Sequence, residues 1–362
     1  MAIPQAAPRP GAAARVNEID LLRFVAALSV LFYHYAFRGY AADDLSAMPY
    51  PALAPLAKYG YLGVELFFMI SGFVILMSVR GGSLRDFAIS RVVRLYPAYW
   101  ACCSISMAAI VLLGAPRFHV GLGQFIANLT MLHGFVGIDS VDGAYWSLAV
   151  EMRFYGFVAL VLLLGQLARA QALLGLWLAL ALVIEVFPNG KLHTLLIVDY
   201  AAYFAAGALF YLTWRDGWSR ARAALIGAAW LLALWQVWHS LDAFERHYHT
   251  DMNRPLVLVI VTGFFAVMAL VASRRTGAIG RRQWVLAGAL TYPVYLLHQN
   301  LGYILFNTLY PELSPHLLLA LALLLVLALA YLVHARIERR VARPLRGWLG
   351  RRWDGLALLA RR

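Results

Sequence analysis

One histidine and two glutamates stand inside long apolar runs of this sequence, where ionisable residues are rare. His34, Glu65 and Glu151 each lie among hydrophobic neighbours. An ionisable side chain in such a run is costly unless it is paired or lines a wet cavity, so it is a functional candidate. An imidazole beside a carboxylate is the usual form of a general base that acts on a hydroxyl group, because the carboxylate orients the ring and stabilises its charged form.

Three arginines have spacings that suit a phosphate-bearing ligand. Arg23 precedes His34 by about three helical turns and shares its face. Arg91 and Arg94 are one turn apart in an expected loop, where two guanidinium groups can contact phosphates. The alternative interpretation is the ordinary excess of positive charge in cytoplasmic loops.

Further polar side chains align at helical spacing. Ser147 and Glu151 share one helix face, as do Tyr295 and His298 on a later run. The structural alternatives are a membrane histidine that only packs against a neighbouring helix, and an ion pair of Arg153 with Glu151 or with another acid, Glu185.

The composition indicates that membrane-spanning helices carry these residues. Of the 362 residues 62% are hydrophobic and 14% charged, whereas soluble domains are roughly a quarter charged. Apolar runs of roughly 18 residues or more can cross a hydrocarbon core. We therefore expect an all-α integral membrane protein with about ten transmembrane helices, near residues 21–38, 60–79, 95–114, 146–165, 173–187, 194–213, 223–240, 255–272, 284–307 and 317–335.

The basic residues predict an orientation. Ten crossings place both termini on one side, and most of the 31 lysines and arginines fall there. The exceptions are Arg153, inside a span, and Arg38, Lys58, Arg117, Lys191, Arg246 and Arg254. Because positive residues concentrate in cytoplasmic loops, we expect both termini in the cytoplasm. His34, Glu65 and Glu151 then lie at similar depth toward the opposite surface, which includes a predicted loop over 239–254.

The remaining segments are assigned by composition. Residues 1–18 are expected to form a disordered cytoplasmic tail, 19–336 the transmembrane domain, and 337–362 a basic amphipathic tail on the membrane surface. The apolar stretch within residues 116–145 is too short to cross a membrane, so we expect an interfacial or partly inserted helix there. The adjacent Cys102 and Cys103 suit helix packing, so we expect no metal site. The net charge of +13 is explained by topology, and no nucleic-acid-binding motif accompanies it.

Five short segments together resemble the acyltransferase 3 family of membrane-bound acyltransferases. They occur in the expected order over approximately residues 17–336. In chain order they are Arg23-x10-His34, Gly63-Val-Glu65-Leu-Phe-Phe with Ser71-Gly72-Phe73, Arg91-x2-Arg94-x2-Pro97, Trp146-Ser147-Leu-x2-Glu151, and Tyr292-Pro-x-Tyr295-Leu-x-His298. Each segment is short, and their order and consistent membrane sides make the resemblance discriminating.

The resemblance implies an enzyme of the O-acetyltransferase kind in a bacterial inner membrane. It implies transfer of an acyl group, commonly acetyl, from cytoplasmic acyl-CoA to a hydroxyl of an extracytoplasmic or lipid-linked glycan, with no tightly bound cofactor. Arg23, Arg91 and Arg94 would bind acyl-CoA. His34 would be the general base, with Glu65 or Glu151 orienting the ring. The expected supporting residues are Ser71, Trp146, Ser147, Tyr295 and His298.

The sequence departs from the family pattern in two places. Arg153 stands where relatives more often carry a neutral polar residue, and no appended esterase-like domain follows the last span. Two other functions remain open. A transporter of a small molecule or polysaccharide also uses ionisable residues at depth, although no inverted repeat is apparent. A noncatalytic scaffold has little need of acids and histidines at one depth.

Overall fold

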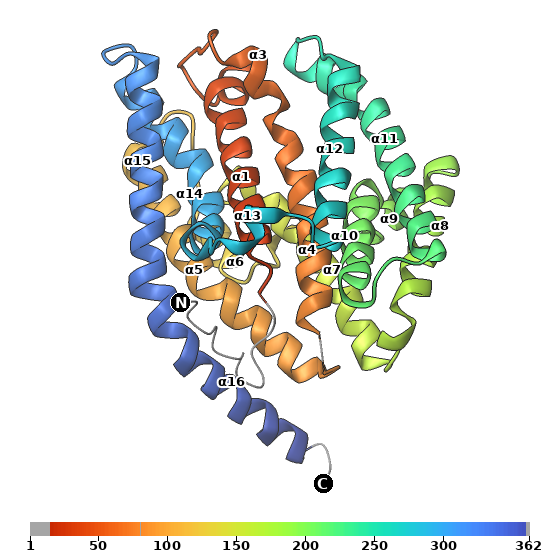
Figure 1. The fold of residues 1–362 in the computed structure, drawn as a ribbon. Coiled ribbons are helices and arrows are strands. Elements are labelled where there is room, and N and C mark those ends of the chain that lie inside the picture. The colour runs from red at the N-terminus through yellow and green to blue at the C-terminus, as the bar shows by residue number, and fades with distance from the viewer. Residues whose placement is uncertain (1–14, 80, 360–362) are drawn as a thin grey trace, which may run out of the picture.

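The computed structural model describes residues 15–79 and 81–359, the last four of these by backbone alone. Within them the chain is helical, and nine helical segments are long and apolar enough to cross a membrane, so this is an all-α polytopic membrane protein (Figure 1). These segments are Asn17–Ala41, Ala54–Ser78, Leu84–Leu113, Gly143–Leu163, Leu167–Val186, Gly190–Asp216, Arg220–Tyr248, Arg254–Ala272 and Pro315–Gly355.

The ninth expected span, residues 284–307, is present as the 25-residue helix α14 (Val285–Leu309). It is not among the nine apolar segments, because Thr291, His298, Gln299 and Asn300 make it polar. All four side chains are buried inside the bundle. The ninth expected span therefore exists and completes the set of ten, but protein rather than lipid surrounds much of its surface.

Capping residues at several helix starts explain where these elements begin. Ser83, Ser219 and Ser314 accept hydrogen bonds from backbone N–H groups at the starts of α5 (Leu84–Leu113), α11 (Arg220–Tyr248) and α15 (Pro315–Val333). Asn189 and Asn253 do the same for α9 (Gly190–Leu195) and α12 (Arg254–Ala272). These side chains satisfy N–H groups that have no partner inside the helix.

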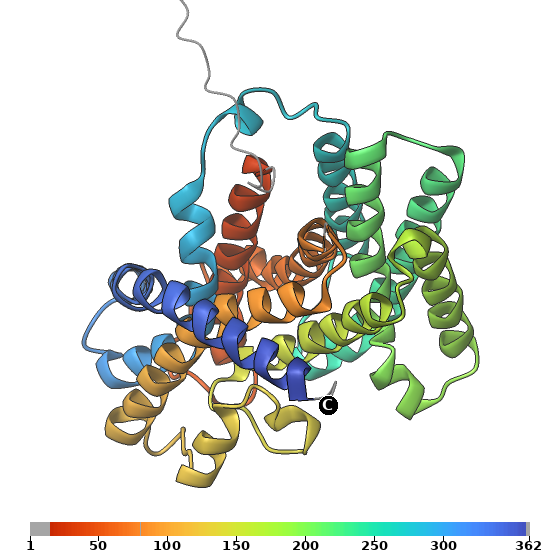
Figure 2. The ribbon, with the colours of Figure 1, turned by 90° about the horizontal axis from the view of Figure 1, so that it is seen from below.

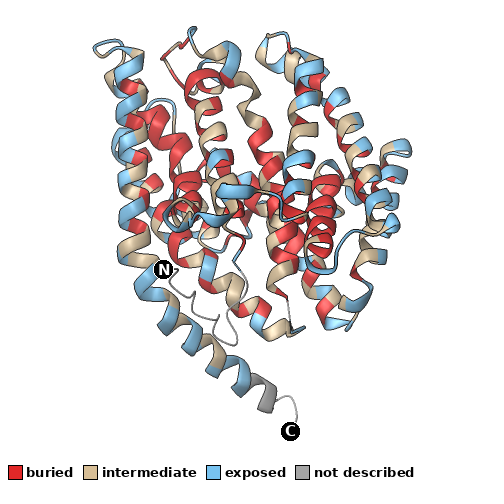
Figure 3. Cartoon of the chain, in the orientation of Figure 1, coloured by how far each residue is buried: buried red, intermediate tan, exposed pale blue. Residues whose placement is uncertain are grey.

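Helix α10 (Val198–Asp216) is the central element and packs most closely against α4 (Gly63–Ser78). A methyl group added at Gly72 of α4 would collide with the backbone carbonyl of Phe204, and one at Gly207 of α10 with that of Met69. Small residues at such crossings let two backbones approach, which is how helices associate where water is absent. Helices α8 (Ala170–Val186), α11 and α12 pack against α10, and most residues of α10 are buried, as the red colour in Figure 3 shows.

Helix α1 (Asn17–Tyr33) lies between α4 and α14, and α14 also packs against α5 and α15. At His34 the regular α-helix changes to a π-helical turn, η1 (His34–Arg38), followed by α2 (Gly39–Ala41). Such π turns are rare in proteins overall, and those that occur are often found at functional sites. The candidate base therefore stands at a local change of helix geometry. The chain then passes through α3 (Ala54–Ala57) and the 3-10 turn η2 (Lys58–Leu62) into α4.

The stretch 116–145 forms a short helix, α6 (Leu122–Asn128), and two 3-10 turns, η3 (His133–Phe135) and η4 (Gly143–Tyr145). No segment of it is long enough to cross a membrane in the described part of the chain. Helix α7 (Trp146–Leu163) follows, and the 3-10 turn η5 (Leu167–Arg169) leads into α8.

The basic C-terminal segment is the helix α16 (Arg339–Leu359), joined to α15 through the π turn η6 (His334–Glu338). It lies beside α5 across one end of the bundle (Figure 2). Arg85 of α5 donates to Asp354 of α16 through Nε at 2.9 Å and Nη2 at 2.8 Å. Residues 1–14 of the expected N-terminal tail lie outside the described residues, and α1 begins at Asn17.

Two expected loops are helical instead. Helix α5 begins at Leu84, so Arg91 and Arg94 stand on a helix and not in a loop before it. Helix α11 continues to Tyr248, so most of the expected outer loop over 239–254 is helix. In both cases the helix continues past its apolar stretch, because charged side chains near the membrane surface are compatible with helix once they reach water. The short helix α13 (Gly277–Arg281) precedes α14.

Candidate active site

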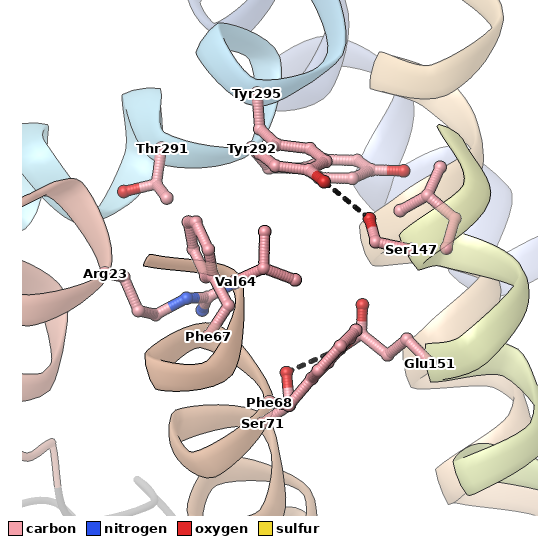
Figure 4. Close-up of a pocket in the computed structure, with 11 residues that line it drawn as sticks. Arg23, Val64, Phe67, Phe68, Ser71, Ser147, Glu151, Thr291, Tyr292 and Tyr295 are labelled. Carbon is pink, nitrogen blue, oxygen red and sulfur yellow. Dashed lines mark hydrogen bonds between the residues drawn. The ribbon is translucent and has the colours of Figure 1, made fainter. Parts of the chain in front are cut away.

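Two adjoining cavities run between α1, α4, α5, α7 and α14. The first, about 40 Å³, is lined by Arg23, Ser71, Ser147, Glu151 and Tyr295, together with apolar and aromatic side chains of α4 and α14 (Figure 4). The second, about 20 Å³, shares with it the side chains of Arg23, Ser71, Glu151 and Tyr292, and adds Arg91, Arg94 and Tyr155. The shared walls make one narrow path. We call it the central cavity.

All three predicted acyl-CoA-binding arginines line the central cavity. The Arg91 guanidinium lies against the rings of Phe87 and Tyr155, with 5.8 and 5.9 Å from its Cζ atom to the ring centroids. Aromatic faces attract guanidinium groups and hold them in place. The arginines therefore face the interior, where an anionic ligand would meet them.

Ser71 and Glu151 meet in this cavity, as Figure 4 shows. Ser71 Oγ donates to Glu151 Oε1 at 2.8 Å, which joins α4 to α7. Glu151 is not paired with Arg153, contrary to the structural alternative: Arg153 Nη1 donates to the carbonyl of Ala149 at 3.2 Å and its guanidinium lies 4.6 Å from the centroid of Phe135. Glu185, the other acid considered, accepts from Gln236 Nε2 instead.

Ser147 and Tyr295 form the next polar contact. Their hydroxyl oxygens lie 2.7 Å apart, and Tyr295 O–H also reaches the carbonyl of Ala144 at 3.2 Å. The neighbouring Trp146 is 44% exposed and packs beside Tyr200, with 5.8 Å between ring centroids. Trp146 is therefore not among the residues that line the central cavity.

His34 and His298 are buried against each other, a pairing that the sequence motifs did not predict. His298 Nε2 lies 3.0 Å from His34 Nδ1, and the ring centroids are 4.8 Å apart. His34 Nδ1 also lies 2.9 Å from the carbonyl of Val30, and His298 Nδ1 lies 2.7 Å from the carbonyl of Tyr295. The two rings therefore form one unit with neighbouring backbone.

These contacts determine where the protons lie when both rings are neutral. A carbonyl oxygen only accepts, so His298 carries its proton on Nδ1 and leaves Nε2 as an acceptor. His34 likewise carries its proton on Nδ1, which it shares between Val30 and His298. The unprotonated nitrogen of His34 is then Nε2, which has no hydrogen bond within the described residues. This assignment rests on the hydrogen-bond network.

Neither predicted carboxylate contacts His34 in the described structure. Glu151 lies in the central cavity, on the side of Ser71. Glu65 lies on another face of α4 and lines a separate cavity with residues of α10 and α11. A helix of 3.6 residues per turn directs neighbouring positions to different partners, so similar depth along the membrane did not imply contact. The partner of His34 is His298.

Two residues of the site were not assigned from the sequence. Tyr292 lines both parts of the central cavity, and its hydroxyl has no partner in the described residues. Asp142 is fully buried and accepts from the backbone N–H groups of Ala144 at 3.0 Å and Asn300 at 3.1 Å. It thereby holds the 116–145 stretch against α14. Burial raises the pKa of the Asp142 carboxyl to about 7, against the effect of these two hydrogen bonds. The signal for Asp142 in the sequence was its place shortly before Trp146, where an aspartate can cap the start of a helical segment.

One group of three side chains has the spacing of metal ligands within the described residues. The ligand atoms of Glu185, His193 and Asp199 lie within 4.8 Å of one another. Glu185 accepts from Gln236 at 2.5 Å, and His193 Nε2 lies 3.5 Å from Asp199 Oδ1. The three groups thus have protein partners of their own. They are separate from the central cavity.

Comparison with known proteins identifies the family. The model of the acyltransferase 3 family, described as an acyltransferase domain, matches residues 16–335. The chain belongs to this family. It is a polytopic membrane protein that carries this acyltransferase domain. No solved structure matches it.

Three relatives illustrate the range of similarity. Nodulation protein 10 of Rhizobium leguminosarum bv. viciae is 28% identical over 188 residues, 44% of this chain and 50% of that protein. The putative acetyltransferase ORF330 of Acidianus two-tailed virus is 23% identical over 291 residues, 77% of this chain and 81% of the other. The putative peptidoglycan O-acetyltransferase YrhL of Bacillus subtilis (strain 168) is 28% identical over 167 residues, 41% of this chain and 24% of YrhL. This acyltransferase therefore spans half the length of the first relative and about a quarter of the third.

Proposed function

We propose that this acyltransferase moves an acyl group, acetyl in the simplest case, from cytoplasmic acyl-CoA to a hydroxyl group of an extracytoplasmic or lipid-linked glycan, with His34 as general base. The observation that carries the proposal is the histidine pair, which leaves Nε2 as the unprotonated nitrogen of the His34 side chain. The names of relatives such as YrhL support a glycan acceptor. The proposed location of the enzyme is a bacterial inner membrane.

The donor binds in the central cavity. Arg91 and Arg94 contact phosphates of the CoA moiety, and Arg23 meets the pantetheine arm or a further phosphate. The cavity of about 40 Å³ has room for a few water molecules and not for the arm. Donor binding therefore requires the side chains between α4 and α14, such as Phe67 and Tyr292, to move.

The reaction is a nucleophilic acyl transfer. His34 Nε2 removes the acceptor hydroxyl proton as that oxygen attacks the thioester carbonyl carbon. The carbon–sulfur bond breaks, and the leaving CoA thiolate takes the proton from the imidazolium. The products are the ester and free CoA.

A hydroxyl group can stabilise the charge that develops during the transfer. Tyr292 lines the central cavity, and its hydroxyl, which has no partner among the described residues, can donate to the thioester oxygen, where negative charge develops. Tyr295 joins this cavity to the histidine pair, since its ring centroid lies 5.5 Å from that of His298. The step thus uses only groups of this chain and the two substrates.

The decisive experiment uses full-length protein in nanodiscs with radiolabelled acetyl-CoA, with and without glycan acceptors. We expect covalent label on the glycan, and loss of about 10²-fold to 10⁴-fold of the rate in His34→Ala, the usual contribution of general base catalysis. A folded, inserted His34→Ala protein with near-normal turnover would remove His34 from this role. Uptake of label into sealed vesicles without covalent transfer would favour the transporter alternative.

A further inference from the structure

A separate cavity, of about 340 Å³, lies between α4, α10 and α11. Its outer wall includes Phe244 and Tyr248 near the C-terminal end of α11, at the end of the bundle opposite α16 (Figure 1). Pockets of about 300 Å³ or more hold small ligands. This cavity is several times larger than the central cavity. We call it the outer cavity.

Three polar groups that line the outer cavity have no hydrogen-bond partner within the described residues. They are Glu65 Oε2, Gln236 Oε1 and the hydroxyl of Tyr61, and each of these atoms is buried. Gln236 is held in one orientation because its Nε2 donates to Glu185 Oε1 at 2.5 Å and to the carbonyl of Val198 at 2.9 Å. Its oxygen is therefore left as an acceptor. Unpartnered buried polar groups are rare in folded proteins and costly.

Tyr248 adds a donor to this set. Its oxygen accepts from the Tyr33 hydroxyl at 2.9 Å and from Arg38 Nε at 3.1 Å. A phenolic oxygen has two acceptor positions, so both are used. The Tyr248 proton is then free to donate to a ligand. The outer cavity thus combines acceptor oxygens of Glu65 and Gln236 with hydroxyl groups that can donate.

Aromatic rings form much of the remaining wall. Tyr61 stacks on Phe244 with centroids 4.8 Å apart, and Phe244 contacts Tyr248 at 4.6 Å. Tyr200 lines the opposite side and packs on Phe68 at 4.7 Å. Sugar rings match such a site, because their C–H faces pack against aromatic rings while their hydroxyls need both donors and acceptors.

The charges of the wall narrow the ligand class. Glu65 and Asp199 are its carboxylates. No lysine or arginine is among the residues that line it, and its one imidazole, His247, lies 3.3 Å from the carboxylate of Asp43. A uronic acid or a phosphorylated sugar would meet like charge without a compensating cation. An uncharged sugar, or one that carries an amino or acetamido group, would not meet this repulsion from the carboxylates.

We propose that the outer cavity binds one neutral or amino-bearing sugar ring of the acceptor glycan, with Glu65, Gln236 and Tyr248 as its hydrogen-bonding groups. The proposal rests on the proposed function, since it assigns the acceptor of the same reaction. Tyr33 connects the cavity to the candidate base: its ring centroid lies 5.9 Å from that of Tyr61 and 5.1 Å from that of His34. Glu65 thereby serves the acceptor instead of the imidazole.

Direct binding tests the proposal without any acyl donor. Full-length protein in nanodiscs is examined by saturation-transfer NMR with cellotetraose, chitotetraose and trigalacturonic acid as probes. We expect transfer to cellotetraose or chitotetraose and none to trigalacturonic acid. Gln236→Leu and Tyr248→Phe should each reduce the signal at least about threefold. Gln166→Leu and Tyr40→Phe are matched controls, because neither residue lines the cavity, and should leave it unchanged.

The outcomes separate this inference from the proposed function. Absence of binding by both uncharged probes, or binding that all four variants leave unchanged, would overturn the sugar site even if acyl transfer to glycans occurs. Where transfer is measured, Gln236→Leu should raise the KM for the glycan about tenfold and leave the KM for acetyl-CoA unchanged. Equal effects on both KM values would also contradict the inference. Sugar binding without acyl transfer would retain the site and reject the enzyme proposal.

Discussion

At the scale of single residues, neutral groups orient His34, the proposed base. The common partner of a catalytic histidine is a carboxylate, yet His34 is held by the carbonyl of Val30 and by His298. Within a bilayer an unpaired carboxylate is expensive to bury. A second imidazole and a backbone carbonyl hold the ring without adding a charge. This arrangement selects the tautomer that leaves His34 Nε2 free.

The role of His298 can be tested by changing its acceptor nitrogen. In His298→Leu the His34 N–H loses one of its two acceptors, so we expect kcat to fall about tenfold, the effect of one hydrogen bond. The KM for acyl-CoA should not change. His298→Gln, whose oxygen can accept from His34, should recover part of the loss. Equal kcat for the Leu variant and the unaltered protein would show that Val30 alone orients the ring.

The arginines of α5 should control the donor. Replacing Arg91 and Arg94 together by Ala removes two guanidinium groups from the central cavity, so we expect the KM for acyl-CoA to rise at least about tenfold. The double variant Arg169→Ala/Arg275→Ala removes the same charge from positions that do not line the cavity and serves as control. An equal rise in the control would reduce Arg91 and Arg94 to topology signals.

At the scale of elements, the crossing of α4 and α10 determines which faces of α4 meet which cavity. Gly72 and Gly207 permit the backbones to touch. This contact fixes the rotation of α4, with Ser71 toward the central cavity and Glu65 toward the outer one. The two cavities are therefore separated by a single helix.

A methyl group at this crossing should therefore destabilise the protein. In Gly207→Ala the new methyl meets the Met69 carbonyl, which cannot rotate away, so we expect a loss of about 1–3 kcal/mol, as for other overpacked cores. Thermal unfolding in detergent measures the change. Gly227→Ala on α11 is the matched control, because open space surrounds its added methyl group. An unchanged unfolding temperature in Gly207→Ala would show that the crossing adjusts at little cost.

At the scale of the whole molecule, the two cavities share a depth at Val64 and Glu65 of α4 and extend from there in opposite directions along the bundle. Two of the three arginines of the central cavity, Arg91 and Arg94, stand on α5, the helix that also binds α16 through Arg85. The outer cavity lies toward the C-terminal end of α11. This separation suits an enzyme whose donor and acceptor come from different sides of a membrane. Its orientation is a prediction from the positive-inside rule.

Cysteine labelling tests that orientation. Arg246 and Arg275 are exposed residues on either side of α12. We expect Arg246→Cys to react with a membrane-impermeant maleimide in intact cells, and Arg275→Cys only after permeabilisation. The native Cys102 and Cys103 are buried and provide an unreactive background. The reverse labelling pattern would place the arginines of α5 on the outer side and contradict a cytoplasmic donor.

Much of the architecture was predictable because bilayer crossing imposes a length and a composition on each helix. The expected span 255–272 differs by one residue from α12, and the span 146–165 begins at the first residue of α7. Helix ends that extend beyond the apolar stretch, as at Leu84 and Tyr248, were not predictable from apolarity. Hydrocarbon thickness constrains only the part of a helix that lies inside it.

The residue types of the site were determined by the sequence, whereas their partners were decided by the tertiary structure. Arg23, Ser71 and Glu151 were each expected to be site residues, and the structure brings them together in one cavity. Glu65 was expected near His34 because the two share a depth, but the close packing of α4 on α10 turns Glu65 away. His298 reaches His34 because α14 packs along α1. Contact depends on the rotation of each helix about its axis, which only the packing of neighbouring helices sets.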